Sequence, residues 1–150
     1  MEPLRFHDFH LRAYTVSDFG TRIVLDLVFD YPDAHKDESR ITFSDVACYS
    51  FLHPSGAIIT DIDELDVATL VQEEAAFFTE VAPQYGLRHW NYSARGIEGY
   101  LSALRNEQMR AWRITSAVGF DGFVIAKSVS GQFTAHPADS GGPTSTPSAA

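Results

Sequence analysis

The chain has 150 residues, of which 45% are hydrophobic and 13% aromatic, which is enough for one domain with its own core and too short for two. Its formal net charge is −9 with only two lysines, and this acidity argues against nucleic acid as a partner. No stretch approaches the roughly 20 apolar residues of a membrane span, and no apolar run typical of a secretory signal follows the start. We therefore expect a cytoplasmic protein with neither a membrane nor a nucleic-acid partner.

The single cysteine, Cys48, excludes an internal disulfide and a paired-cysteine zinc site. It lies in an apolar stretch without a basic neighbour that would lower the pKa of its thiol. We predict that Cys48 is a core residue, and that the protein has no cofactor and no metal site.

Alternating side chains predict a β-hairpin at the start of the chain. Residues 4–16 alternate between a mixed and a more apolar face, and residues 21–30 alternate again with a clean apolar face. The segment 17–20 between them contains Gly20 and is typical of a turn.

Further strands are predicted after a polar loop over residues 31–39. Residues 40–53 have the pattern of a third strand, bulged or broken near Ser44 and Asp45. A turn over 54–56 precedes a short fourth strand over 57–60. Near the C-terminus, residues 109–117 and 123–130 predict two more strands, and residues 87–92 fit either a strand or a loop.

Two segments have the spacing of amphipathic helices. The first is 67–81, which Asp66 caps and which Pro83 and then Gly86 end. The second is 95–107, with apolar residues at i, i+3, i+4 and i+7.

This order of elements predicts an α+β fold. We expect a mainly antiparallel or mixed sheet of five to seven strands, with the two helices (about 67–81 and 95–107) packed on one face. The globular domain should span residues 1–133. Fifteen of the 17 residues in 134–150 are Ala, Gly, Pro, Ser or Thr, so we predict a disordered tail there.

Charge is divided along the chain. Residues 41–87 contain eight acidic and no basic residues, a net charge of −8, whereas 88–113 contain five arginines and two glutamates, a net charge of +3. We predict that the acidic segment binds a basic partner through Asp61, Asp63, Glu64, Asp66, Glu73, Glu74 and Glu80. The run 61–66 lacks the pattern of a calcium loop, and we expect its acids to crowd the start of the following helix.

An alternative site involves Asp8 and His10. On a strand both side chains point to the same side, about 6.5 Å apart, and could supply two metal ligands or a base with its orienting carboxylate. Trp90 and Trp112 are candidates for the rim of the same pocket, between the sheet and the helices.

No catalytic motif is present: the chain has no G-x-S-x-G elbow, Walker loop or G-x-G-x-x-G turn. The sequence therefore favours a non-catalytic acidic interaction protein that binds a basic partner, comparable in kind to a bacterial toxin-immunity protein. The alternative is a small-ligand-binding domain or a metal-dependent enzyme with a site around Asp8 and His10. A third hypothesis is self-association through a sheet edge.

Overall fold

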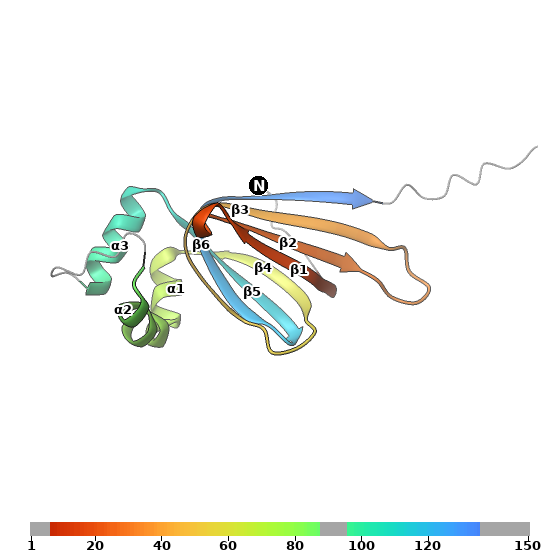
Figure 1. Cartoon of the computed structure of the whole chain (residues 1–150), viewed down its shortest axis with the longest axis horizontal. Coiled ribbons are helices and arrows are strands. Elements are labelled where there is room, and N and C mark those ends of the chain that lie inside the picture. The colour runs from red at the N-terminus through yellow and green to blue at the C-terminus, as the bar shows by residue number, and fades with distance from the viewer. Residues whose placement is uncertain (1–6, 88–95, 136–150) are drawn as a thin grey trace, which may run out of the picture.

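The computed structural model describes residues 7–87 and 96–135, which form a six-stranded antiparallel β-barrel with short helices at one end (Figure 1). The strand order around the barrel is β1-β2-β3-β6-β5-β4. The strands are β1 (Phe9–Ser17), β2 (Arg22–Phe29), β3 (Asp37–Leu52), β4 (Ile58–Leu65), β5 (Arg110–Val118) and β6 (Asp121–Ala135). The α+β class is confirmed with β-structure predominant. The mixed-sheet alternative is wrong, because every ladder between described strands is antiparallel.

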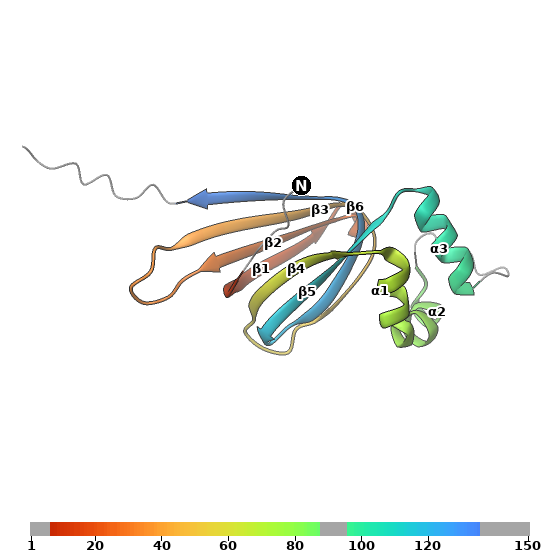
Figure 2. The same cartoon turned by 180° about the vertical axis from the view of Figure 1, so that it is seen from behind.

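The two longest strands, β3 and β6, pair along nearly their whole length and hold the barrel together. Their ladder shifts register between Val46 and Cys48, next to Asp45 in a left-handed conformation (φ 54°). This bulge confirms the irregularity predicted near Ser44 and Asp45. In Figures 1 and 2 both strands bend, so that one part of each lies in the same layer as β1 and β2 and the other part in the same layer as β4 and β5.

The helical region between β4 and β5 is more broken than predicted. Its described elements are α1 (Val67–Glu73), the π-helix η2 (Phe77–Val81), α2 (Ala82–Tyr85) and α3 (Gly96–Asn106). The predicted single helix over 67–81 is wrong, because Glu74 leaves helical geometry (φ −98°, ψ 34°). None of the described helices is long and apolar enough to cross a membrane.

Pro83 does not end the helical region. It lies in the first turn of α2, which follows η2 directly, and helical structure continues to Tyr85. Gly86, with φ of 82°, follows as the C-cap. The predicted stop at Pro83 is therefore wrong, and the predicted stop at Gly86 is confirmed.

Several strand ends differ from the predictions. The fourth strand runs to Leu65 and not to residue 60, and the loop predicted over 31–39 gives way to β3 at Asp37. The last strand is longer than 123–130 and extends two residues into the predicted tail. The rest of that tail and most of the predicted 87–92 element lie outside the described residues.

Two hydrophobic cores lie on opposite faces of the same strands. The interior of the barrel is filled mainly by aliphatic side chains with Phe43, Trp112 and Phe120. The second core lies between the helices and the outer face of β3, β5 and β6, and centres on Phe78, Tyr100 and Phe123. Small residues of the strands, such as Ala111, face the helices and allow them to approach the sheet.

Cys48 is buried in the second core, which confirms its predicted role as a core residue. Burial raises the pKa of its thiol to about 12, and a hydrogen bond with Tyr100 partly opposes this rise. The thiol is therefore protonated at neutral pH and has little nucleophilic character.

Candidate partner-binding surface and a neighbouring pocket

The acidic segment begins on β4 and continues through the helices, so its carboxylates do not all gather at a helix start as predicted. Asp61, Asp63 and Glu64 belong to β4. Only Asp66 occupies the predicted capping position, where its carboxylate accepts from the N–H groups of Ala68 (3.0 Å) and Thr69 (3.3 Å). The alternation of Asp61 and Asp63 with the buried Ile62 is that of a strand with one face in the core.

Arg110 on β5 holds Glu64, the last of the three acids on β4. Its Nε donates to Glu64 Oε1 at 2.6 Å, and a second guanidinium nitrogen donates to Oε2. This hydrogen bonding lowers the pKa of the Glu64 carboxyl below its usual value, since it favours the charged form. The guanidinium also lies 5.2 Å from the centre of the Trp112 ring, and this stacking fixes its orientation.

Arg113 makes an equivalent connection on the other face of β5. Its two terminal nitrogens lie 2.8 Å from Glu73 Oε2 and 2.8 Å from Glu74 Oε1 at the end of α1. The cross-strand neighbour of Arg113 on β4 is Asp63. One arginine therefore sits among three carboxylates, which leaves a local excess of negative charge.

The acidic and basic segments of the sequence thus partly neutralise each other in the fold, because two arginines of the basic segment pair with acids of the acidic segment. The seven predicted binding residues separate into two groups. Glu64, Asp66, Glu73 and Glu74 are held by intramolecular partners. Within the part of the chain that the structure describes, the carboxylates of Asp61, Asp63 and Glu80 have neither an ion pair nor a hydrogen bond, and Asp63 and Glu80 are exposed.

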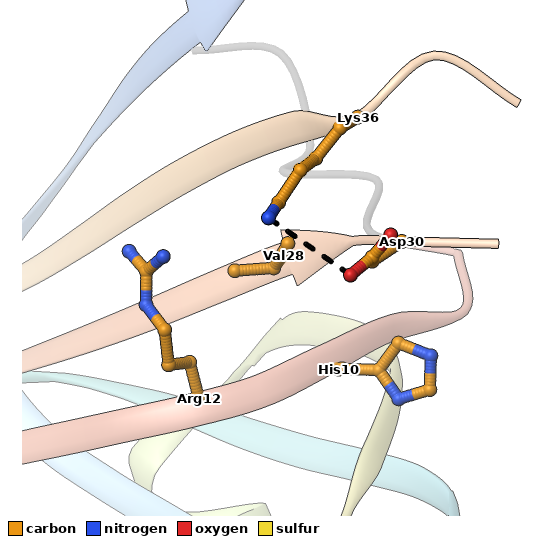
Figure 3. A pocket seen from close by; sticks show the side chains of 5 residues that line it. All are labelled: His10, Arg12, Val28, Asp30 and Lys36. Atoms are coloured by element: carbon orange, nitrogen blue, oxygen red, sulfur yellow. Dashed lines mark ion pairs between the residues drawn. The ribbon is translucent and has the colours of Figure 1, made fainter.

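A pocket of about 350 Å³ lies on the outer face of β1 and β2, lined by His10, Arg12, Val28, Asp30 and Lys36 (Figure 3). Lys36 and Asp30 face each other across it at 3.9 Å. Arg12 binds Glu38 at 3.0 Å. Each cation of the pocket therefore has a carboxylate neighbour, and the site has little net charge with which to attract an ion.

The structure does not bring the residues of the alternative site together. Asp8 lies before β1 in a left-handed conformation (φ 61°), its carboxylate is 3.6 Å from the His7 imidazole, and its carbonyl accepts from the Tyr31 hydroxyl. The strand alternation that would align Asp8 with His10 therefore starts one residue too late. His10 instead stacks beside Tyr31, with ring centres 5.0 Å apart.

Trp112 does not extend this site. Trp112 is only 2% exposed and fills the barrel interior, where the sequence suggested a pocket rim. Trp90 lies outside the described residues. Within residues 7–87 and 96–135, no group of three or more His, Cys, Asp or Glu side chains could hold a metal ion. The site around Asp8 and His10 stays a prediction.

Arg110 and Arg113 hold acids of the predicted binding segment, and neither was among the residues predicted for the site. Their signal was present, because residues an odd number apart on a strand face opposite sides, so one strand could supply arginines to two faces. What the sequence lacked was the pairing of β5 with β4, which places Arg110 near Glu64, and the contact of α1 with β5, which brings Glu73 and Glu74 to Arg113.

No family model, curated protein or solved structure matches this chain. Its function must therefore be argued from its own residues.

Proposed function

We propose that the protein is a non-catalytic interaction protein whose acidic surface binds a basic partner, in the manner of a bacterial immunity protein that neutralises a basic toxin. The observation that supports this proposal most directly is the presence of carboxylates without partners in the same segment as acids that are already held by arginines. Asp63 is the clearest case, because it is the cross-strand neighbour of Arg113, whose side chain is committed to Glu73 and Glu74.

The two groups of acids have different roles in this proposal. The paired acids fix β4, β5 and α1 relative to one another, so the surface is rigid before a partner arrives. Asp61, Asp63 and Glu80 keep their charge available for the partner's Lys and Arg side chains. Such a surface accelerates encounter with a basic protein, and the effect weakens as salt screens it.

The test is a charge-matched comparison of two triple variants. The first, Asp61→Asn, Asp63→Asn and Glu80→Gln, removes the unpaired acids of the proposed surface. The control, Asp33→Asn, Asp45→Asn and Asp121→Asn, removes three exposed acids elsewhere and changes the net charge by the same amount. Asn tolerates the left-handed conformation of Asp33 and Asp45, so the control should fold normally.

The tagged wild-type protein should co-purify from its native host at low salt with one stoichiometric basic protein. The first triple variant should then bind that protein with an association rate lowered at least tenfold, whereas the control should bind at close to the wild-type rate. Co-expression with the captured protein should also relieve any toxicity that it has. Equal losses in the two variants, or no stoichiometric basic protein, would contradict the proposal.

A further inference from the structure

The barrel closes between β1 and β4 over a very short seam. Only two residue pairs, Phe9–Ile59 and His10–Ile58, form the ladder, and the N–H of Leu11 then donates to the carbonyl of Ala57 at 2.9 Å. Beyond Leu11, β1 continues to residue 17. No described strand pairs with this stretch on the side away from β2, so it presents an open edge on which another strand can pair.

The hydrogen-bonding direction along this edge can be followed residue by residue. The N–H of Leu11 points away from β2, and the bulge between Leu11 and Ala13 adds one residue before the alternation resumes. Tyr14 and Val16 therefore direct their N–H and C=O groups away from β2. The hydrogen bonds of β2 give the same result. The carbonyl of Thr21, just before β2, points toward β3, where it accepts from the N–H of Val46. By alternation the backbone groups of Ile23 and Leu25 also point toward β3, so their partners Val16 and Tyr14 do not bond to β2.

The same two residues expose apolar side chains. Tyr14 and Val16 are each 37% exposed, although they pair with Leu25 and Ile23 on the face that lines the barrel interior. The Tyr14 ring packs against Phe51, with ring centres 5.2 Å apart. It also lies 5.8 Å from the His53 ring, so these apolar side chains are partly covered and keep about a third of their surface exposed along the edge.

We propose that this edge pairs with the same edge of a second copy of the chain, forming a two-fold symmetric antiparallel dimer centred on Thr15. In this register Tyr14 of each copy faces Val16 of the other, and each such pair exchanges two N–H···O=C bonds. An aromatic side chain opposite a β-branched one is a favourable cross-strand pair. The two Thr15 residues face each other at the symmetry axis.

The residues around the edge favour a second copy over an unrelated extended peptide. A second copy offers the same edge, so the register sets Tyr14 against Val16 twice, once on each side of the symmetry axis, whereas an unrelated peptide would have to supply both matching side chains. The register also places the fully exposed Phe19 at the end of the new ladder. Centring the pair on Tyr14 instead would set Val16 against Arg12, which the bulge turns toward β2. The proposed dimer does not involve the acidic surface, so the two proposals are tested independently of each other.

The first test is a disulfide across the symmetry axis. A Thr15→Cys variant places two cysteines in a non-hydrogen-bonded pair with Cα atoms about 4.5 Å apart, within the range for a disulfide. Cys48 does not compete, because it is buried and its thiol is protonated. Ser130→Cys, an exposed strand position on β6, is the matched control.

Under mild oxidation, T15C should convert almost completely to a covalent dimer while S130C stays monomeric. Equal cross-linking of both variants would indicate random collision, and absence of cross-linking in T15C would exclude the register. Either result overturns the proposal.

The second test removes a backbone hydrogen-bond donor of the edge and introduces no thiol. Val16→Pro deletes an N–H that points away from β2, so the β1–β2 ladder is retained while pairing at the edge is lost. Sedimentation of the full chain should show a dimer for wild type, with a dissociation constant at least tenfold weaker in V16P and an unchanged circular dichroism spectrum. Added salt should tighten the wild-type dimer, since each copy carries a formal charge of −9. A wild-type protein that stays monomeric up to about 1 mM would refute the dimer.

Discussion

Strands β6 and β1 belong to the same barrel but experience opposite environments. From Gly122 to Ala126 every residue of β6 is buried, with Val124 facing the barrel interior and Phe123 facing the helices. No residue of β1 is buried, and beyond its short seam with β4 the one described strand that pairs with it is β2. Although the barrel is closed, its strands therefore differ widely in how many of their side chains are buried.

This contrast separates stability from recognition. A strand with two neighbours and two packed faces contributes most to the free energy of unfolding, because its apolar side chains leave water completely. A strand with one neighbour and half-exposed side chains contributes less, and it keeps backbone and apolar groups available to a partner. Paired substitutions in the two regions measure the difference.

The largest difference should come from two glycines with positive φ. Gly119, between β5 and β6, has φ of 77°, and a Cβ there would lie 2.1 Å from the carbonyl oxygen of Gly56. Gly20, after β1, has φ of 84° and nothing within 4 Å of a Cβ. Gly20→Ala should lower the free energy of unfolding by about 1 kcal/mol through backbone strain alone, and Gly119→Ala by about 3–4 kcal/mol through strain plus the clash.

Urea unfolding followed by circular dichroism measures both values. Equal losses for the two alanines would mean that the loops containing Gly56 and Gly119 separate without cost. The β5–β6 end of the barrel would then be as open as the β1 end.

A second contrast uses one substitution in two strands. Val124→Ala in β6 removes two fully buried methyl groups and should cost about 2–3 kcal/mol, whereas Val16→Ala in β1 should cost under about 1 kcal/mol. Unfolding should be measured at low protein concentration, where any dimer through β1 has dissociated. A Val16→Ala loss as large as that of Val124→Ala would show that β1 is covered in solution even in the monomer.

Local patterns predicted most individual elements. The hairpin of β1 and β2, the helix near 95–107 and the strand near 109–117 follow from alternation or helical spacing within each segment. The bulge near Asp45 was visible as a break in that alternation. These features depend on residues close in sequence, so one chain suffices to predict them.

The predictions that failed concern features that depend on contacts between residues far apart in sequence. The run of acids after residue 60 resembled a helix start because their charges suit a helix N-terminus, but pairing with β5 keeps them in a strand. Closure of the sheet joins β1 to β4 across about 50 residues of sequence, for which no local signal exists. The acidic segment could be located from the sequence, and its role as a binding surface stays a prediction. Its division into paired and unpaired acids required the positions of Arg110 and Arg113.

The smallest contrast concerns two arginines. Arg113 has a side chain 21% exposed and binds two glutamates, whereas Arg12 is 50% exposed and binds Glu38 alone. Arg113→Gln leaves Glu73, Glu74 and Asp63 without a cation among them, and it should cost about 1–2 kcal/mol at neutral pH. Arg12→Gln should cost under about 0.5 kcal/mol, because an exposed pair contributes little beyond the entropy it loses.

Salt should reduce the difference, since it screens the repulsion among the three acids that remain in the Arg113 variant. If both substitutions prove equally mild in dilute buffer, the ion pairs of Arg113 do not hold α1 to β5. The acidic surface would then lack the rigid support that gives its unpaired carboxylates their place.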